Sequence, residues 1–273
     1  MAHRLLFMVG ESPGTILEEE QGMGEILRAW SRPTAIFVAI AAVCAPDAFA
    51  QGGDGYLFSE PKVTIEFESG YAFQRAQSQL FDYAIEDFTI DRRDFDSPYI
   101  GGEIAVRLSE RWDIALSLGF QKSSIDSEYR EFIGADDLPI LQVTELRQVP
   151  AVASLKFYPF DRGRSLGRFA WIPRTVAPFV GAGVGVVSYR FEQSGEFIDF
   201  ETNDIYVDTF VTDRQGPIAR AAAGVNVSLS KQFLFTAEGR YSWASADVGG
   251  SYQTFDRIDL DGLQLVGGLA IRF

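Results

Sequence analysis

Ionisable side chains recur at alternate positions in several segments of this sequence whose intervening positions are apolar. In a β-strand, alternate side chains point to opposite faces, so such charges share a face with other polar groups. Five acidic and five basic residues fit this pattern: Glu66, Glu68, Glu103, Asp113, Glu238, Arg107, Lys156, Arg220, Arg240 and Arg272. Equal numbers of opposite charges that are enclosed together should pair, because an unpaired buried charge is costly. The pattern therefore predicts a network of ion pairs.

Other kinds of chemistry are limited by the residues that the chain lacks. The only histidine is His3 and the only cysteine is Cys44. Without a histidine after Ala50, histidine-dependent catalytic triads and histidine-ligated zinc sites are excluded from that part of the chain. We therefore expect no enzymatic activity, no cofactor and no catalytic or metal-ligating residue. The formal net charge of −14 argues against nucleic acid as a partner.

Residues 33–50 have the features of a secretory signal peptide. An apolar core over residues 35–44 follows two basic residues, and Ala48 and Ala50 form an A-x-A cleavage site. The core is too short to span a bilayer as a helix. We weighed a buried core helix and lipidation at Cys44 as alternatives. The prediction is a signal peptide over residues 23–50 that is cleaved after Ala50.

Residues 1–22 do not fit in front of this signal, because they include a run of three glutamates where a signal peptide should be basic. Met23 begins a segment of ordinary signal length. The hypothesis is that translation starts at Met23, and that residues 1–22 are a non-native upstream extension. The exported protein would then be residues 51–273.

Eight segments after Ala50 alternate in character over the 9–11 residues, approximately, that a tilted membrane-spanning strand requires. They lie near 63–74, 100–108, 112–121, 149–157, 178–191, 219–229, 233–243 and 263–273. In the fifth of these, either face could point outward. Tight turns (109–111 and 230–232) and a longer link (161–173) alternate with long polar connections near 76–97, 122–146, 192–216 and 247–260.

This pattern predicts an all-β fold: a single transmembrane antiparallel up-and-down β-barrel of eight strands, formed by residues 51–273. Its turns would be short on the periplasmic side, and its extracellular loops would be long and acidic. Aromatic residues near both ends of the strands match the two girdles of a barrel in lipid. A lipocalin-like soluble barrel is the alternative, since alternation alone does not separate inside from outside.

Four segments of the chain resemble the small eight-stranded outer-membrane barrels of Gram-negative bacteria, the OmpA-like, OmpW-like and opacity-type group. They are VPAVASLKFYPF (149–160), APFVGAGVGVVSYRF (177–191), FTAEGRYSW (235–243) and LVGGLAIRF (265–273), and the resemblance covers roughly 57–273. It implies location in the outer membrane, with its lipid and lipopolysaccharide as partners. It also implies that Leu265, Leu269, Ile271 and Phe273 form the signal read by the barrel-assembly machinery.

The long connections are acidic: residues 192–216 carry seven acidic residues and one basic residue. Such a surface resists aggregation, and its carboxylates could bind divalent cations that bridge to lipopolysaccharide. Asp136 with Asp137, and Asp256 with Asp259 and Asp261, are the candidate clusters. Apolar residues within the first and third connections predict strands that extend beyond the membrane as hairpins, or else a sticky surface for a partner.

An eight-stranded barrel is just wide enough for its own side chains to fill. The ten charges would then pair inside a plugged lumen, and the protein would serve as a structural or surface-interaction protein. The alternative is a narrow, OmpW-like channel for small or apolar solutes. A lipid-modifying enzyme is the least favoured function, because barrel enzymes of the outer membrane resemble one another in using a catalytic histidine, and residues 51–273 contain none.

Overall fold

The structure is a computed structural model that describes residues 57–134, 137–166, 170–199, 202 and 204–273. The described residues from Leu57 onward belong to one compact unit. The predicted upstream extension (1–22) and signal peptide (23–50), including Ala48 and Ala50, lie outside the described residues. None of the helices in the described ranges is long and apolar enough to cross a membrane.

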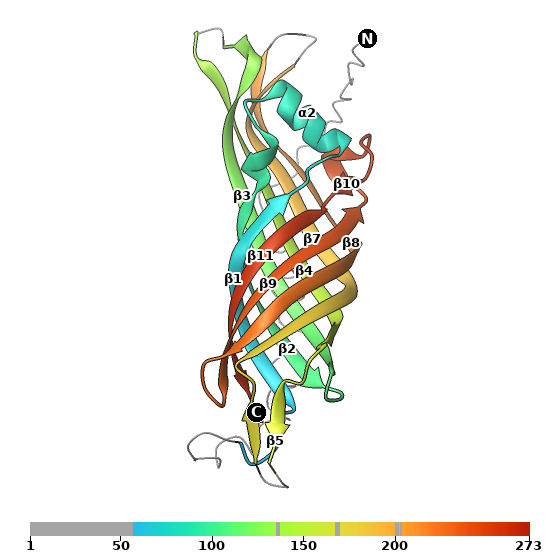
Figure 1. The fold of residues 1–273 in the computed structure, drawn as a ribbon. Helices are drawn as coiled ribbons and strands as arrows, with labels where there is room; N and C mark the ends of the chain where they lie inside the picture. The colour runs from blue at the N-terminus through green and yellow to red at the C-terminus, as the bar shows by residue number, and fades with distance from the viewer. Residues whose placement is uncertain (1–56, 135–136, 167–169, 200–201, 203) are drawn as a thin grey trace, which may run out of the picture. The chain divides into compact units, whose positions relative to one another are not determined.

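Eight long antiparallel strands form the body of the fold (Figure 1). They pair in the order β9–β11–β1–β2–β3–β4–β7–β8, and β8 also pairs with β9, so the sheet closes into a ring. The strands are β1 (Val63–Gln74), β2 (Ser97–Arg107), β3 (Trp112–Ile133), β4 (Pro139–Phe157), β7 (Val176–Ile198), β8 (Ile205–Ser228), β9 (Phe233–Ala246) and β11 (Gly262–Arg272). Each strand pairs with its neighbours along the chain, which confirms the predicted eight-stranded up-and-down barrel.

Alternation along the strands places polar side chains inside the ring and apolar side chains outside it. Glu66 and Glu68 of β1 are buried, whereas Phe67 between them is exposed. Trp112 and Phe157 pack together on the outside near the tight turns, with ring centroids 4.8 Å apart. Tyr241 and Trp243 do the same toward the other end, at 4.9 Å. A closed ring with this outer surface leaves no strand edge open, which is the condition for spanning lipid with strands.

The orientation of β7, which alternation left ambiguous, is set by its inward aromatic residues. Phe179 and Tyr189 are buried, and they share a face with the glycines of this strand. Val180, Val184 and Val186 lie on the other face and are exposed. The valines therefore point outward, toward the surface that lipid would cover.

Two of the predicted long connections are in fact mostly strand. β3 continues to Ile133 and β4 begins at Pro139, and β7 and β8 together continue through most of residues 192–216. The prediction of irregular polar loops was wrong for much of these residues, because charged side chains such as Lys122, Asp126 and Glu128 occupy the exposed face of a strand. Buried residues such as Ile125, Tyr129, Ile140 and Leu146 supply the apolar inner face. The alternative prediction of a hairpin extension, made for the first and third connections, agrees with β7 and β8 in the third, and the second connection has the same form without having been predicted.

The first connection departs from that prediction, because it contains helix α2 (Gln79–Asp87) and the short helix η1 (Arg92–Phe95) instead of a hairpin. Phe81, Tyr83 and Ile85 alternate, but Leu80, Phe81 and Ala84 are the residues that the helix buries. Spacings of one, three and four residues place side chains on one side of a helix. The last connection contains helix η2 (Gly250–Tyr252) and strand β10 (Ile258–Asp259), which pairs with β9.

Candidate functional site: the ion-paired lumen

A chain of alternating charges crosses the middle of the lumen. Lys156 Nζ on β4 lies 2.5 Å from Glu103 Oε1 on β2 and 3.4 Å from Glu238 Oε2 on β9. Arg240 lies 2.9 Å from Glu238 and 3.0 Å from Glu68 on β1. The N–H groups of Arg240 in these contacts are not aligned for hydrogen bonds, so the attraction is that of ion pairs. Five of the ten predicted lumen charges are therefore joined in one connected set.

Three predicted members of the network, Arg220, Glu66 and Arg272, have no ion-pair partner among the described residues, and the first two of them lie beside the connected set. Arg220 donates to Ser242 Oγ at 3.2 Å and to Ser117 Oγ at 3.4 Å. Glu66 is buried, and its carboxylate lies directly over Gly268 of β11, where any Cβ would clash with it. Both residues thus lie inside the lumen beside the five connected charges, but neither forms an ion pair with them.

The remaining three predicted charges lie toward the tight turns. Asp113 pairs with Arg162 at 2.6 Å, and Arg107 pairs with Glu60. Arg272 donates only to neutral oxygens, those of Lys231, Ser230 and Ser228. All ten predicted residues thus point into the barrel. Their partners at this end, Arg162 and Glu60, come from segments outside the long strands that alternation could not assign.

Several uncharged lumen residues were missed by the search for charges. The hydroxyl of Tyr99 donates to Glu68 at 3.2 Å, and Gln264 Nε2 donates to Gln121 Oε1 at 2.7 Å across the barrel. The sequence did contain the information, because Tyr99 lies an even number of residues from Glu103 and Arg107 on the same strand and therefore shares their face. Gln121 likewise shares the parity of Asp113.

The ring of Tyr99 fits the lumen because the neighbouring wall carries glycine. A Cβ on Gly119 would lie 2.4 Å from the Tyr99 ring, whereas a Cβ on Gly239 would meet nothing closer than 3.6 Å. We predict that Gly119→Ala lowers the free energy of unfolding by about 1–3 kcal/mol through overpacking, measured by urea titration in lipid vesicles. The matched Gly239→Ala should remain near wild type. Equal stabilities of the two variants would mean that Tyr99 has room to move.

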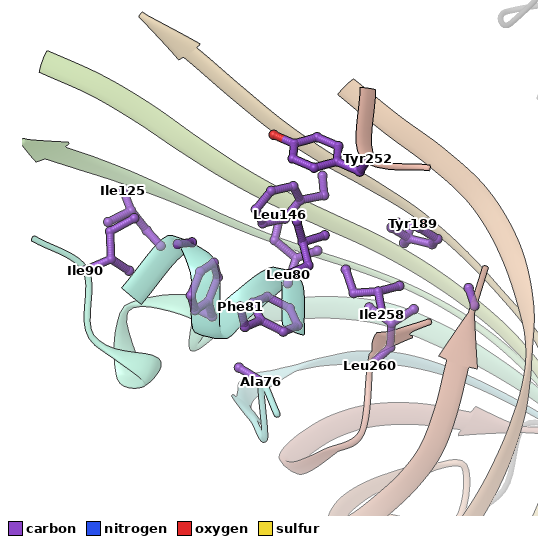
Figure 2. Packing of buried hydrophobic residues seen from close by; sticks show 14 of the residues in the cluster. Ala76, Leu80, Phe81, Ile90, Ile125, Leu146, Tyr189, Tyr252, Ile258 and Leu260 are labelled. Atoms are coloured by element: carbon purple, nitrogen blue, oxygen red, sulfur yellow. The ribbon is translucent and has the colours of Figure 1, made fainter. Parts of the chain in front are cut away.

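The end of the barrel opposite the tight turns is closed by an apolar core (Figure 2). Leu80 and Phe81 of α2 pack with Tyr252, Ile258 and Leu260 of the last connection. The ring of Phe81 lies 4.7 Å from that of Phe95 and 6.0 Å from that of Phe191 on β7. Helix α2 therefore acts as a lid whose inner face continues the core of the extended hairpins.

Tyrosines in this apolar core stay neutral. Burial raises the pKa of Tyr129 to about 12, and burial also raises the pKa values of Tyr83 and Tyr252. The hydroxyl of Tyr252 donates to Gln193 Oε1 at 2.7 Å, so one polar tip has its partner inside the core. Neutral phenols allow these large side chains to be buried without the cost of an unpaired charge.

The tight-turn end is covered by a small hairpin of β5 (Gly163–Ser165) and β6 (Trp171–Pro173), which lies near the end of β11 (Figure 1). Trp171 is buried, and its main chain exchanges two hydrogen bonds with Leu57, at 2.9 and 2.8 Å. Between the two ends, a cavity among Lys156, Arg220 and Arg240 measures only about 10 Å³. That is room for about one water molecule.

The acidic cluster near the lid forms structural contacts. Asp259 Oδ2 accepts from the amide of Gln77 at 3.2 Å, and Asp261 Oδ1 accepts from the amide of Ala244 at 2.7 Å. Asp261 also pairs with Arg75 at 3.2 Å. In the part of the chain that the structure describes, no group of three His, Cys, Asp or Glu residues could hold a metal ion. Asp136 lies outside that part, and divalent-cation binding stays a prediction.

Several solved structures have a similar fold. Neisserial surface protein A matches with 11% identity and a TM-score of 0.43, over 77% of this chain and 96% of its own. OprG from Pseudomonas aeruginosa matches with 14% identity and a TM-score of 0.45, over 80% of this chain and 99% of its own. The outer-membrane protease OmpT from Escherichia coli matches with 9% identity and a TM-score of 0.35, over 81% and 99%.

No protein-family model matches the chain, and no curated protein matches it in sequence. At such low identities, the likeness to solved structures concerns the fold alone. The class that the strands and the lumen define is a small eight-stranded antiparallel β-barrel with a polar, ion-paired interior and an apolar exterior, and the chain is similar in fold to small outer-membrane barrels.

Proposed function

We propose that this protein is an integral outer-membrane barrel of a Gram-negative bacterium that acts as a structural or surface-interaction protein. The observation that carries the proposal is a lumen that its own side chains fill. Lid α2 covers one end, the β5–β6 hairpin covers the other, and the chain of ion pairs from Glu103 to Glu68 lies between them. A filled barrel contributes to the cell through its surfaces.

The surface role is supported by the extension of β3, β4, β7 and β8 beyond the other strands (Figure 1). This raised part carries exposed apolar side chains at its far end. Ile133 and Val207 are 71% and 78% exposed, and Leu141 is 55% exposed. Exposed apolar residues within an acidic, water-facing surface are typical of a protein-contact region.

The outer-membrane location is supported by the outer face of the barrel and by its last strand. Leu265, Leu269, Ile271 and Phe273 all point outward, as a signal for the barrel-assembly machinery would require. Outer-membrane lipid would cover the apolar surface, and lipopolysaccharide would surround its outer half. We propose no catalytic activity, since the barrel-forming residues 51–273 contain no histidine to serve as a base.

Single-channel recording in a planar bilayer tests whether the lumen is closed. We expect no steady conductance steps from protein purified from outer membranes and shown to be folded by its heat-dependent gel mobility. Discrete steps whose size changes in Glu103→Lys would instead support the narrow channel for small or apolar solutes. The surface variant Glu145→Lys serves as the charge-matched control, and its current recording should be the same as that of the wild type.

A further inference from the structure

The tight-turn end of the barrel holds a pocket in which positive charge exceeds negative charge. The pocket has a volume of about 50 Å³ and lies between the strand ends and the β5–β6 hairpin. Six basic residues and three acidic residues (Glu66, Glu103 and Asp113) line it, and Lys156 among the basic residues is paired with Glu103. We name the other five basic residues the basic chamber: Lys62, Arg107, Arg162, Arg174 and Arg272. Two acidic residues pair with them, Glu60 with Arg107 and Asp113 with Arg162.

Arg107, Arg162 and Arg272 line the same small pocket, where Arg272 is buried and the other two are half-buried. Like charges enclosed together repel one another, and only Arg107 and Arg162 have a carboxylate partner to offset this repulsion. Arg272 has no carboxylate partner: its Nε and Nη2 groups donate to neutral oxygens at 2.8–2.9 Å. Its Nη1 group has no acceptor among the described residues. A bound anion would relieve this repulsion, and it would accept hydrogen bonds from the N–H groups that have no acceptor.

The guanidinium groups are held in place before any ligand binds. Arg162 stacks on Tyr158 at 4.2 Å, and Arg272 lies over Trp171 at 5.5 Å. Arg162 is fixed further by donating to the carbonyl oxygens of Ser109 and Glu110. Arranging the donors in advance lowers the entropic cost of binding.

The arrangement of donors favours a tetrahedral anion. Arg107 comes from β2, Arg162 from the connection after β4, and Arg272 from β11, so three separate segments bring guanidinium groups to the same pocket. A phosphate group presents acceptor oxygens in several directions, and its charge suits the guanidinium fork. We propose that the basic chamber binds a phosphate group, carried either by a small soluble phosphate or by a phospholipid headgroup.

Calorimetric titration of inorganic phosphate into the purified full-length protein, in phosphate-free neutral detergent at low salt, tests the proposal. We expect saturable binding that is at least about 10-fold weaker in Arg272→Gln, since a charge-assisted contact accounts for about a factor of ten or more. Arg164→Gln is the matched control, because Arg164 is exposed on β5 and does not line the chamber. Arg107→Gln repeats the test should Arg272→Gln fail to assemble.

Micelles that contain phosphatidic acid or phosphatidylcholine form the second arm of the experiment. Binding of phosphatidic acid alone, lost in Arg107→Gln, would identify a lipid headgroup as the source of the phosphate. Binding of inorganic phosphate with the same dependence would identify a soluble ligand. Absence of binding in both arms would overturn the proposal, as would equal affinities in the Arg272→Gln and Arg164→Gln variants.

Discussion

Replacing Lys156 with methionine is expected to destabilise the barrel by about 3–5 kcal/mol, because it leaves the buried carboxylate of Glu103 without a counter-charge and Glu238 with Arg240 alone. Lys156 is the cation between Glu103 and Glu238, and all three side chains are at most 6% exposed. Methionine keeps the length of the side chain and removes only its charge and donors. The free energy of unfolding is measured by urea titration in lipid vesicles, followed by tryptophan fluorescence and by gel mobility.

Lys122→Met is the matched control for this variant. Lys122 lies 2.7 Å from Glu145, but their side chains are 41% and 33% exposed. Exposed pairs of this kind contribute less than about 1 kcal/mol, so the control should remain close to wild type. Adding Glu103→Gln to Lys156→Met should recover part of the lost stability, because Glu103 is the carboxylate that loses its ion-pair partner, whereas Glu238 keeps Arg240.

A Lys156→Met protein as stable as the control would contradict the filled lumen. Water would then be solvating Glu103 and Glu238 in place of the lysine, and a wet lumen is the first requirement of a channel. The stability measurement and the conductance measurement therefore examine the same physical question by independent means.

Strand parity made the lumen readable from the sequence. In a closed ring each side chain can only point in or out, so alternation assigned all ten charges to the inside. Which of these charges pair with one another could not be predicted in the same way. Lys156 contacts Glu238 because β4 and β9 face each other across the ring. The distance between two such side chains depends on strand tilt and stagger, which composition does not encode.

The raised part of β3, β4, β7 and β8 was harder to predict, because outside lipid an outward face need not be apolar. There, charged outward faces give strands the composition of loops, as in residues 122–133 of β3. Helix α2 was hidden for a different reason. Its nine residues are too few to show helical periodicity clearly, and its stability comes from packing against Phe95 in the same connection and against Phe191, which is distant in the sequence.

Replacing Phe81 with alanine should loosen the lid without opening the lumen. The side chain is fully buried among Phe95, Phe191 and the strands of the raised part, so its removal costs about 3–5 kcal/mol locally. A local opening that is easier by 3 kcal/mol is about 100-fold more populated. Trypsin should then cleave after Arg92 or Arg93, both exposed beside the lid, at a rate that rises by up to about this factor.

Glu86→Ala is the control on the same helix, because Glu86 is exposed and its loss leaves the core intact. Equal cleavage rates in the two variants would show that Phe81 does not hold the lid. The conductance of Phe81→Ala separates the two barriers in the lumen. Since the ion pairs of Lys156 and Arg240 lie deeper than α2, a loosened lid should still leave the bilayer silent. Conductance in this variant would mean that the lid alone closes the barrel, and that the charged layer beneath it is permeable.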